Sequence, residues 1–307
     1  MAVAELEAEA LLTLEEESQF LIIWRRFRKH KLALAGLVVI TIILIAVVLA
    51  PLIAPYDPIK DLNLQNMNAP LSLEHLMGTD RIGRDVFSRL LYAGRISLFV
   101  AFSVVTFSES AGAVIGAVSG YFGGAVDSLI QRVVEFFLTL PLLPLLLALS
   151  AILGGVYIPG LPREWSSAVI IIIILTAFGW MGASVLVRGV VLSLRNQDFT
   201  EAARALGMSS WQIIIRHMMP NALAPLIVDA TLGLGTVIII ESALSFLGFG
   251  IQLPVATWGN MLNEYQADMW TQPAKVFFPG LAIFVCTLAF NYVGDGLRDA
   301  VDPRLKM

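Results

Sequence analysis

Apolar residues are concentrated in six long runs, which shorter polar segments separate. The runs lie at approximately 32–54, 94–118, 129–153, 167–190, 226–250 and 278–297. An α-helix rises about 1.5 Å per residue, so about 20 apolar residues cross the roughly 30 Å hydrocarbon layer of a bilayer. The pattern therefore predicts an all-α membrane protein with six transmembrane helices, and an even number of crossings places both termini on the same side.

Composition supports a membrane as the solvent. Of the 307 residues, 57% are hydrophobic and 14% are charged, whereas soluble domains are roughly 45 to 50% apolar. The single cysteine, Cys286, lies in the last apolar run, which excludes a disulfide within the chain and a metal cluster built from thiolates. The first run is longer than the roughly 7 to 15 residues of a signal-peptide core, so we expect it to be a retained anchor.

Basic residues predict the orientation. The stretch "WRRFRKHK" (residues 24–31) directly precedes the first run, and a juxtamembrane basic cluster is typical of the cytoplasmic side. Alternation then places the loop 191–225 and the C-terminal tail in the cytoplasm as well. These two segments carry further basic residues, namely Arg195, Arg204, Arg216, Arg298, Arg304 and Lys306.

One external segment departs from this charge rule. It contains four basic residues, Lys60, Arg81, Arg84 and Arg89. We expect the neighbouring Asp80 and Asp85 to offset part of this charge.

The pattern divides the chain into five parts. They are a cytoplasmic N-terminal tail (1–31), an anchor helix (32–54), an external loop that ends in an interfacial helix (55–93), a five-helix core that includes the cytoplasmic loop 191–225 (94–298) and a cytoplasmic C-terminal tail (299–307). The interfacial helix is expected because Ile82, Val86, Leu90 and Leu91 recur at helical spacing. The acidic segment ahead of the anchor is expected to be a solvated helix, with docking to a partner as the alternative.

The cytoplasmic loop contains two short amphipathic segments in "EAARALGMSSWQIIIRHMMP", residues 201–220. Asp198 or Thr200 is expected to cap the first segment, and Glu201 lies in its first turn, where the helix dipole favours negative charge. Alanines at 202, 203 and 205 favour a helix with little side-chain bulk.

The end of the first segment and the start of the second have clear signals. Gly207 is expected to form a left-handed C-terminal cap, Ser209 and Gln212 match a capping box, and Pro220 is expected to limit the second helix. The sequence thus predicts a rigid helix–turn–helix that projects from the membrane, with a plain connecting loop as the alternative.

This loop, "EAARALGMSSWQIIIRHMMPN", resembles the glutamate-alanine-alanine loop in permease subunits of ATP-binding-cassette (ABC) importers. Further stretches are similar to the C-type subunit of the dipeptide and oligopeptide permease family, over about residue 25 to the C-terminus. They include "MGTDRIGRDVFSRLLYAGRISL" (77–98), "ESALSFLGFG" (241–250) and "GDGLRDAVDPRL" (294–305).

The resemblance implies a type I ABC importer permease fold in a bacterial or archaeal cytoplasmic (inner) membrane. The chain would form half of a channel with a B-type permease, two ATP-binding subunits and an external substrate-binding protein, and would carry di- or oligopeptides, with nickel or another small solute as the alternative. Nucleic acid is not an expected partner. The resemblance implies that the loop contacts an ATPase through Asp198, Phe199, Glu201, Ala202, Ala203, Arg204, Leu206, Gly207, Ser209 and Trp211.

No chemistry is expected in this chain itself. It lacks the GxxxxGK[ST] phosphate-binding loop, so ATP and Mg²⁺ would be bound by the partner ATPases, and we expect no cofactor, catalytic residue or metal site here. His30, His75 and His217 are widely separated and are expected at the surface. An ion-coupled secondary transporter and a non-transporting scaffold are the alternative classes. The former would not need a projecting cytoplasmic helix–turn–helix, and loss of uptake on deletion of the chain would argue against the latter.

Polar residues inside the apolar runs need a reason, because an ionisable residue at the bilayer centre costs about 2.5 to 3.5 kcal/mol on insertion scales. Glu109, Glu241 and Asn291 are candidates for the translocation pathway, and hydrogen bonding between helices is the alternative for Glu241 and Asn291. Glu135 and Asp229 are expected either to face the protein interior or to reach the membrane surface.

Overall fold

The computed structural model describes residues 19–302, and every regular element in this range is helical. No strand forms between residues 19 and 302, where a single bridge joins Thr79 and Asp85. Five helices are long and apolar enough to span a membrane. They are α3 (Lys31–Val48), α5 (Val86–Phe122), α8 (Arg163–Leu194), α11 (Met219–Phe246) and α13 (Pro273–Val301).

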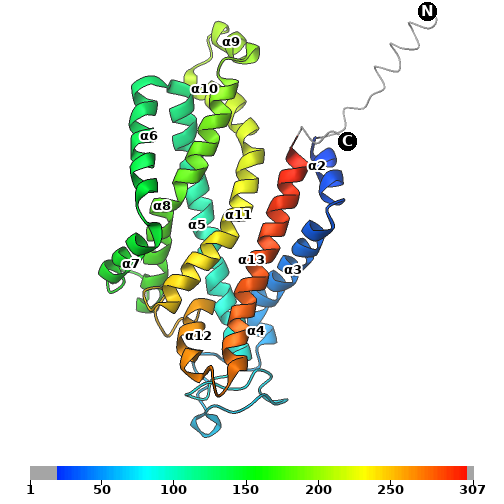
Figure 1. Cartoon of the computed structure of the whole chain (residues 1–307), viewed down its shortest axis with the longest axis vertical. Helices are drawn as coiled ribbons and strands as arrows, with labels where there is room; N and C mark the ends of the chain where they lie inside the picture. Colours follow the sequence, from blue (N-terminus) through cyan, green and yellow to red (C-terminus); the bar gives the residue numbers. More distant parts are fainter. Residues whose placement is uncertain (1–18, 303–307) are drawn as a thin grey trace, which may run out of the picture.

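Apart from α6 and α7, which are described below, the remaining helices lie at the ends of the bundle. They are α2 (Gln19–Phe27), α4 (Ala50–Ile53), α9 (Asp198–Ala205), α10 (Ser210–Ile213) and α12 (Trp258–Tyr265), with short turns η1 (Leu64–Asn66), η2 (Ile214–Met218) and η3 (Gln266–Asp268). Figure 1 shows an elongated bundle with α9, α10, α2 and the end of α13 at one end, and with α4, α12 and the loop before α5 at the other. The two ends of the described chain therefore lie at the same end of the bundle as α9, as the predicted topology requires. That this end faces the cytoplasm stays a prediction.

The third predicted span is not a single straight helix. It consists of α6 (Gly124–Thr139) and α7 (Leu142–Leu153), which are bent by 88° at the break. Leu140 is extended before Pro141, because a residue that precedes proline is disfavoured in the α conformation. The prediction of a continuous helix over 129–153 is therefore wrong, and the count is five spans, or six if this bent pair is one span (Figure 1).

The predicted interfacial helix is also wrong as a separate element. Asp85 caps α5 by accepting a hydrogen bond from the backbone N–H of Ser88 at 2.8 Å, and the helix then continues without a break to Phe122. Ile82 lies in the preceding turn. Gly94 does not break the helix, because its bare backbone packs closely against Val47 and Trp258.

The helices α5 and α8 pack through a stripe of small residues. Gly112, Gly116 and Gly120 recur at every fourth position of α5, and a Cβ atom at each would lie within 3.0 Å of a backbone carbonyl oxygen of α8, at Trp180, Ser184 and Arg188 respectively. Small residues at this spacing let two membrane helices approach closely. The stripe holds together the two helices that line much of the membrane region.

Gly116→Ala is expected to lower the free energy of unfolding by about 1 to 3 kcal/mol, because one added methyl group would overpack a close backbone contact. Chemical unfolding in detergent micelles would measure this change. Gly189→Ala is the control, since α8 leaves open space around Gly189. Equal losses in the two variants would contradict the stripe as a packing element.

An ion cluster joins the loop before α5 to α12 at the opposite end from α9. Arg89 is fully buried and forms ion pairs with Asp80, at 2.7 Å, and with Glu264. Arg84 contacts the same two carboxylates at 2.7 and 3.1 Å. Burial raises the pKa of Asp80, but the charges of Arg89 and Arg84 and the N–H of Arg84 outweigh it, so this pKa lies below its ordinary value.

The expected charge compensation is thus confirmed for Asp80 but not for Asp85. Besides capping α5, Asp85 contacts the ring nitrogen Nδ1 of His75 at 3.0 Å. His75 is buried, so its predicted surface position is wrong. A local sequence reading could not place this histidine, because its partner lies ten residues further on.

Candidate functional site

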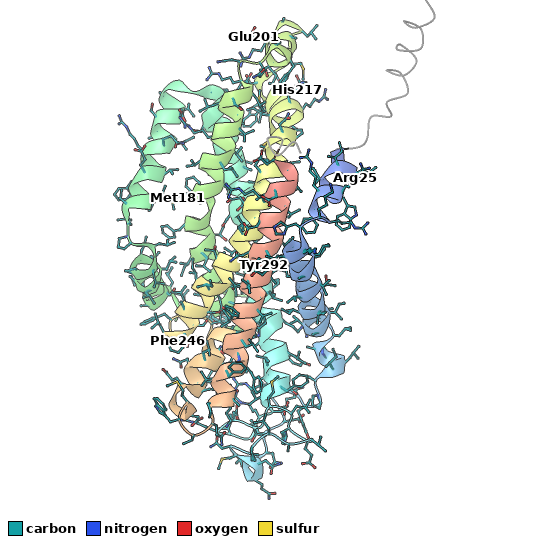
Figure 2. The ribbon with its side chains drawn as sticks, turned by 45° about the vertical axis from the view of Figure 1, so that its right-hand side comes forward. Arg25, Met181, Glu201, His217, Phe246 and Tyr292 are labelled. Atoms are coloured by element: carbon teal, nitrogen blue, oxygen red, sulfur yellow. The ribbon has the colours of Figure 1, made fainter. Side chains whose placement is uncertain are left out.

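The segment between α8 and α11, residues 195–218, is called the projecting loop. In Figure 2, Glu201 lies at its tip and His217 below it, at the end of the molecule beyond Arg25. Four large apolar side chains of this loop are exposed: Leu206 by 84%, Ile215 by 63%, Trp211 by 54% and Phe199 by 42%. A projecting element with exposed apolar side chains has the character of a contact surface.

The opposite face of α9 is anchored to the bundle. Ala203 is buried in a cluster that includes Ile213 and Met218, and the hydroxyl of Thr200 donates a hydrogen bond to the carbonyl oxygen of Leu194 at 2.9 Å. The guanidinium of Arg204 lies 5.4 Å from the ring centre of Tyr121 in α5. The projecting loop is therefore held by the ends of α5, α8 and α11.

Gly207 forms the predicted left-handed turn, with φ of 79°. The N–H of Gly207 bonds to the carbonyl of Arg204 at 3.0 Å, and the N–H of Met208 bonds to that of Ala203 at 3.1 Å, which is a Schellman motif. The capping box that opens α10 is also confirmed, because Ser209 and Gln212 exchange hydrogen bonds of 2.9 and 3.4 Å.

Two predictions about this loop are wrong. The N-cap of α9 is Gln197 and not Asp198 or Thr200, and the side chain of Gln197 makes no capping hydrogen bond. The hydroxyl of Thr200 is instead used to hold α8. Asp198 and Glu201 both lie in the first turn of α9, where the helix dipole favours their charge.

Pro220 does not end the second helix. It lies in the first turn of α11, and α10, the π-helical turn η2 and α11 form one apolar helical stretch from Ser210 to Phe246. Proline lacks an N–H and collides with the carbonyl four residues earlier in a regular helix, and the wider π turn just ahead of it provides room. The projecting loop is therefore continuous with a membrane helix.

A cavity of about 310 Å³ lies between α5, α7, α8 and α11. Glu109 of α5 and Asp229 of α11 both line it. Asp229 lies ten residues inside α11, about 15 Å along its axis, and lines a cavity between helices. It therefore faces the protein interior, the first of its two predicted positions. Glu135 is exposed on α6, away from this cavity.

Comparisons with known proteins decide the family. Residues 112–307 match the binding-protein-dependent transport system inner membrane component, and residues 18–70 match the N-terminal transmembrane domain of oligopeptide transport permease C. The chain belongs to this permease family. It is a multi-pass protein of the bacterial inner membrane. The match to a binding-protein-dependent transport component favours the importer interpretation over a secondary transporter or a scaffold.

Several relatives of this permease are similar over nearly their whole length. The dipeptide transport system permease protein DppC of Alkalihalophilus pseudofirmus is 41% identical over 283 residues, which are 92% of this chain and 89% of that protein. DppC of Bacillus subtilis is 38% identical over 92% of this chain and 85% of its own. The glutathione transport system permease protein GsiD of Escherichia coli is 39% identical over 92% of this chain and 90% of its own.

Glu241 of the permease is enclosed by other residues and does not line an open cavity. It is fully buried and accepts hydrogen bonds from the hydroxyl groups of Ser245, at 2.7 Å, and Ser97, at 3.4 Å. The hydroxyl oxygen of Ser97 in turn accepts the N–H of Trp258 at 3.2 Å. This arrangement joins α5, α11 and α12 and favours the interhelical alternative for Glu241.

Asn291 of the permease lies in a different place from Glu109. It lines a separate cavity of about 330 Å³ between α11 and α13, together with Thr287 and Ile239. The three predicted pathway residues therefore lie in three different environments.

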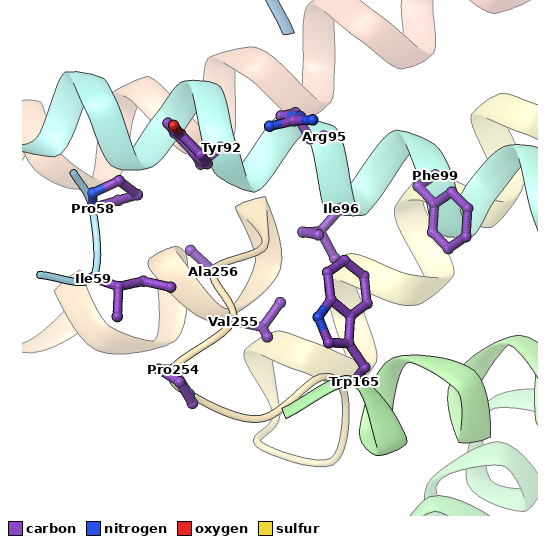
Figure 3. A pocket seen from close by; sticks show the side chains of 10 residues that line it. All are labelled: Pro58, Ile59, Tyr92, Arg95, Ile96, Phe99, Trp165, Pro254, Val255 and Ala256. Atoms are coloured by element: carbon purple, nitrogen blue, oxygen red, sulfur yellow. The ribbon is translucent and has the colours of Figure 1, made fainter. Parts of the chain in front are cut away.

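A larger cavity of the permease, about 550 Å³, was not predicted. It lies at the α12 end of the bundle and is lined by Tyr92, Arg95, Phe99 and Trp165, among others (Figure 3). The sequence signal that could have indicated this cavity was Arg95, an arginine within an otherwise apolar helical run. The volume and the mainly apolar walls are typical of small-molecule sites.

The other two histidines of the permease have ordinary roles. His30 caps α3 by accepting a hydrogen bond from the N–H of Ala33 at 3.1 Å. His217 is half-buried beside the ring of Phe199. Between residues 19 and 302, no group of three or more His, Cys, Asp or Glu side chains is placed to hold a metal ion.

Proposed function

We propose that this permease forms half of the translocation pathway of an ATP-driven importer of di- or oligopeptides. The other components would be a B-type permease, two cytoplasmic ATP-binding subunits, which would hold ATP and Mg²⁺, and an external substrate-binding protein. The peptide cargo is supported by the relatives, whose names specify dipeptide and glutathione transport.

The observation that carries the coupling role is the continuity between the projecting loop and the membrane helices. The exposed side chains of Phe199, Leu206 and Trp211 provide a contact surface for an ATPase. A displacement of this surface would move α11 directly through η2, and would move α5 and α8 through the contacts of Arg204 and Thr200.

This coupling needs no chemistry in the permease. ATP would shift the importer between inward-facing and outward-facing states by binding one of them more tightly. We propose that Asp198, Glu201 and Arg204 orient the contact by charge, and that the small side chain of the exposed Ala202 lets α9 approach the ATPase closely. The buried Ala203 would transmit the displacement, because its small side chain packs α9 against the bundle. Gly207 and Ser209 would fix the angle between α9 and α10.

Leu206→Ala is expected to weaken binding of the ATPase subunits at least fivefold, or about 1 kcal/mol, because Leu206 is the most exposed apolar side chain of the projecting loop. The affinity of the detergent-solubilised permease for its ATPase subunits would measure this. Leu129→Ala is the matched control, since Leu129 is also an exposed leucine but lies on α6, outside the projecting loop. Unchanged affinity in Leu206→Ala would contradict docking at this surface.

Uptake by proteoliposomes tests the transport class itself. Peptide uptake is expected to require ATP and the binding protein and to persist without a proton gradient. Uptake that follows a proton gradient in the absence of ATP would contradict the proposed function.

A further inference from the structure

The cavity between α5, α7, α8 and α11 contains acidic residues without a basic partner. Two carboxylates, that of Glu109 on α5 and that of Asp229 on α11, line it, and the residues that line it include no lysine, arginine or histidine. The two groups are close enough for their charges to interact. An ionisable residue at membrane depth normally has a partner or a transport role, and a cation would satisfy both carboxylates.

Two polar atoms of this cavity lack hydrogen-bond partners in the described structure. One is the hydroxyl of Ser108, whose residue is only 4% exposed, and the other is Oε2 of Glu109. The Ser108 hydroxyl lies against Gly179, which lines the same cavity. Buried polar atoms are nearly always paired, so these two atoms are available to a group that enters the cavity from outside the chain.

The cavity also has room for such a group. Its volume of about 310 Å³ is at the lower end of the range for ligand sites, roughly 300 to 1,000 Å³. Gly182 contributes open wall, since a Cβ atom at this residue would meet nothing within 4 Å. Leu146 and Phe178 supply an apolar side. This combination suits a cationic group attached to a short apolar stem.

We propose that Glu109, Asp229 and Ser108 form a binding site for an ammonium group of the cargo, either the N-terminal amine or a lysine side chain of a peptide. The carboxylates neutralise the charge, and the Ser108 oxygen accepts one N–H. The inference rests on the proposed peptide-importer function. It adds a preference for peptides that carry an ammonium group, made in the membrane part of the pathway and separate from selection by a binding protein.

The test is peptide binding to the assembled importer in nanodiscs, without the binding protein, by isothermal titration calorimetry. Three probes separate the two sources of ammonium: alanyl-lysine, alanyl-norleucine and N-acetyl-alanyl-norleucine. Removing the ammonium group that binds is expected to weaken binding about tenfold or more, the value of a charge-assisted hydrogen bond. If the lysine side chain is recognised, alanyl-norleucine binds more weakly than alanyl-lysine. If the N-terminal amine is recognised, N-acetyl-alanyl-norleucine binds more weakly than alanyl-norleucine.

Variants connect this preference to the cavity. Glu109→Gln and Asp229→Asn are each expected to reduce the difference between charged and uncharged probes to about twofold, and Ser108→Ala to reduce it in part. Glu135→Gln is the matched control, because Glu135 is an exposed carboxylate outside the cavity, and it is expected to keep the full difference.

Three outcomes would overturn the inference. They are equal binding of all three probes, an unchanged preference in both Glu109→Gln and Asp229→Asn, and failure of both variants to assemble with the partner subunits while Glu135→Gln assembles. The last result would make the carboxylates an assembly contact. ATP-driven uptake of alanyl-alanine distinguishes these outcomes from a failure of the proposed function, because only the latter abolishes uptake in the wild-type importer.

Discussion

Arg89→Ala is expected to lower the free energy of unfolding by about 3 to 5 kcal/mol, because removing one partner of a buried ion pair leaves the other charge without compensation. Arg89 is 1% exposed, and its guanidinium contacts Asp80, Glu264 and the hydroxyl of Tyr265. In the variant, Asp80, which is 2% exposed, would keep Arg84 as its remaining ion-pair partner. Reversible unfolding in mixed micelles would measure the loss.

Arg81→Ala is the matched control for this prediction. Arg81 carries the same charge and pairs with Asp268 at 2.8 Å, but half of its side chain is exposed, so we expect a loss of at most about 1 kcal/mol. Arg89→Lys is expected to fall between the two, since lysine keeps the charge but cannot contact two carboxylates with a planar fork. Equal losses for Arg89→Ala and Arg81→Ala would show that the buried cluster is not a major source of stability.

The membrane spans could be predicted from the sequence because their signal is local. About 20 apolar residues in succession are enough to identify a span, and five of the six predicted spans correspond to continuous helices. The exception, 129–153, is bent at Leu140 and Pro141. Proline in a membrane helix is compatible with either a kink or a break, and contacts with other helices decide between them.

In the projecting loop, too, features that depend on local sequence were predicted and features that depend on distant contacts were not. Gly207 and the Ser209 capping box were predicted correctly because each depends on neighbours within five residues. Thr200 and Pro220 were assigned wrongly because their roles depend on the end of α8 and on the π turn η2. Such dependence on tertiary structure overrides local preference.

The cavity residues were predicted only in part. Glu109 stood out as a carboxylate in an apolar run, but the sequence did not show that it lines the same cavity as Asp229, which is 120 positions further along the chain. Ser108 and Gly179 gave no signal of their own, because small residues are common in membrane helices. The folded arrangement alone shows that an unpaired hydroxyl lies beside the two carboxylates.

Gly207→Val is expected to uncouple ATP hydrolysis from transport, without preventing insertion into the membrane. Gly207 has φ of 79° with open space around it, so valine would strain only the backbone. An L-residue in this conformation costs about 1 to 2 kcal/mol, which would lower the ratio of the native turn to other conformations, and with it the limit on coupling, by about 5- to 30-fold. Because this turn sets the angle between α9 and α10, uptake per ATP hydrolysed in proteoliposomes is expected to fall by the same factor.

Two matched variants separate coupling from strain. Gly207→Asn is expected to retain most of the coupling, since asparagine tolerates the left-handed conformation. Gly124→Val introduces comparable strain at φ of 54°, also with open space around it, but at the first residue of α6, outside the projecting loop. It is expected to leave uptake per ATP unchanged. If Gly124→Val uncouples as strongly as Gly207→Val, strain anywhere at this end of the bundle is sufficient, and the specific role of the α9–α10 angle is contradicted.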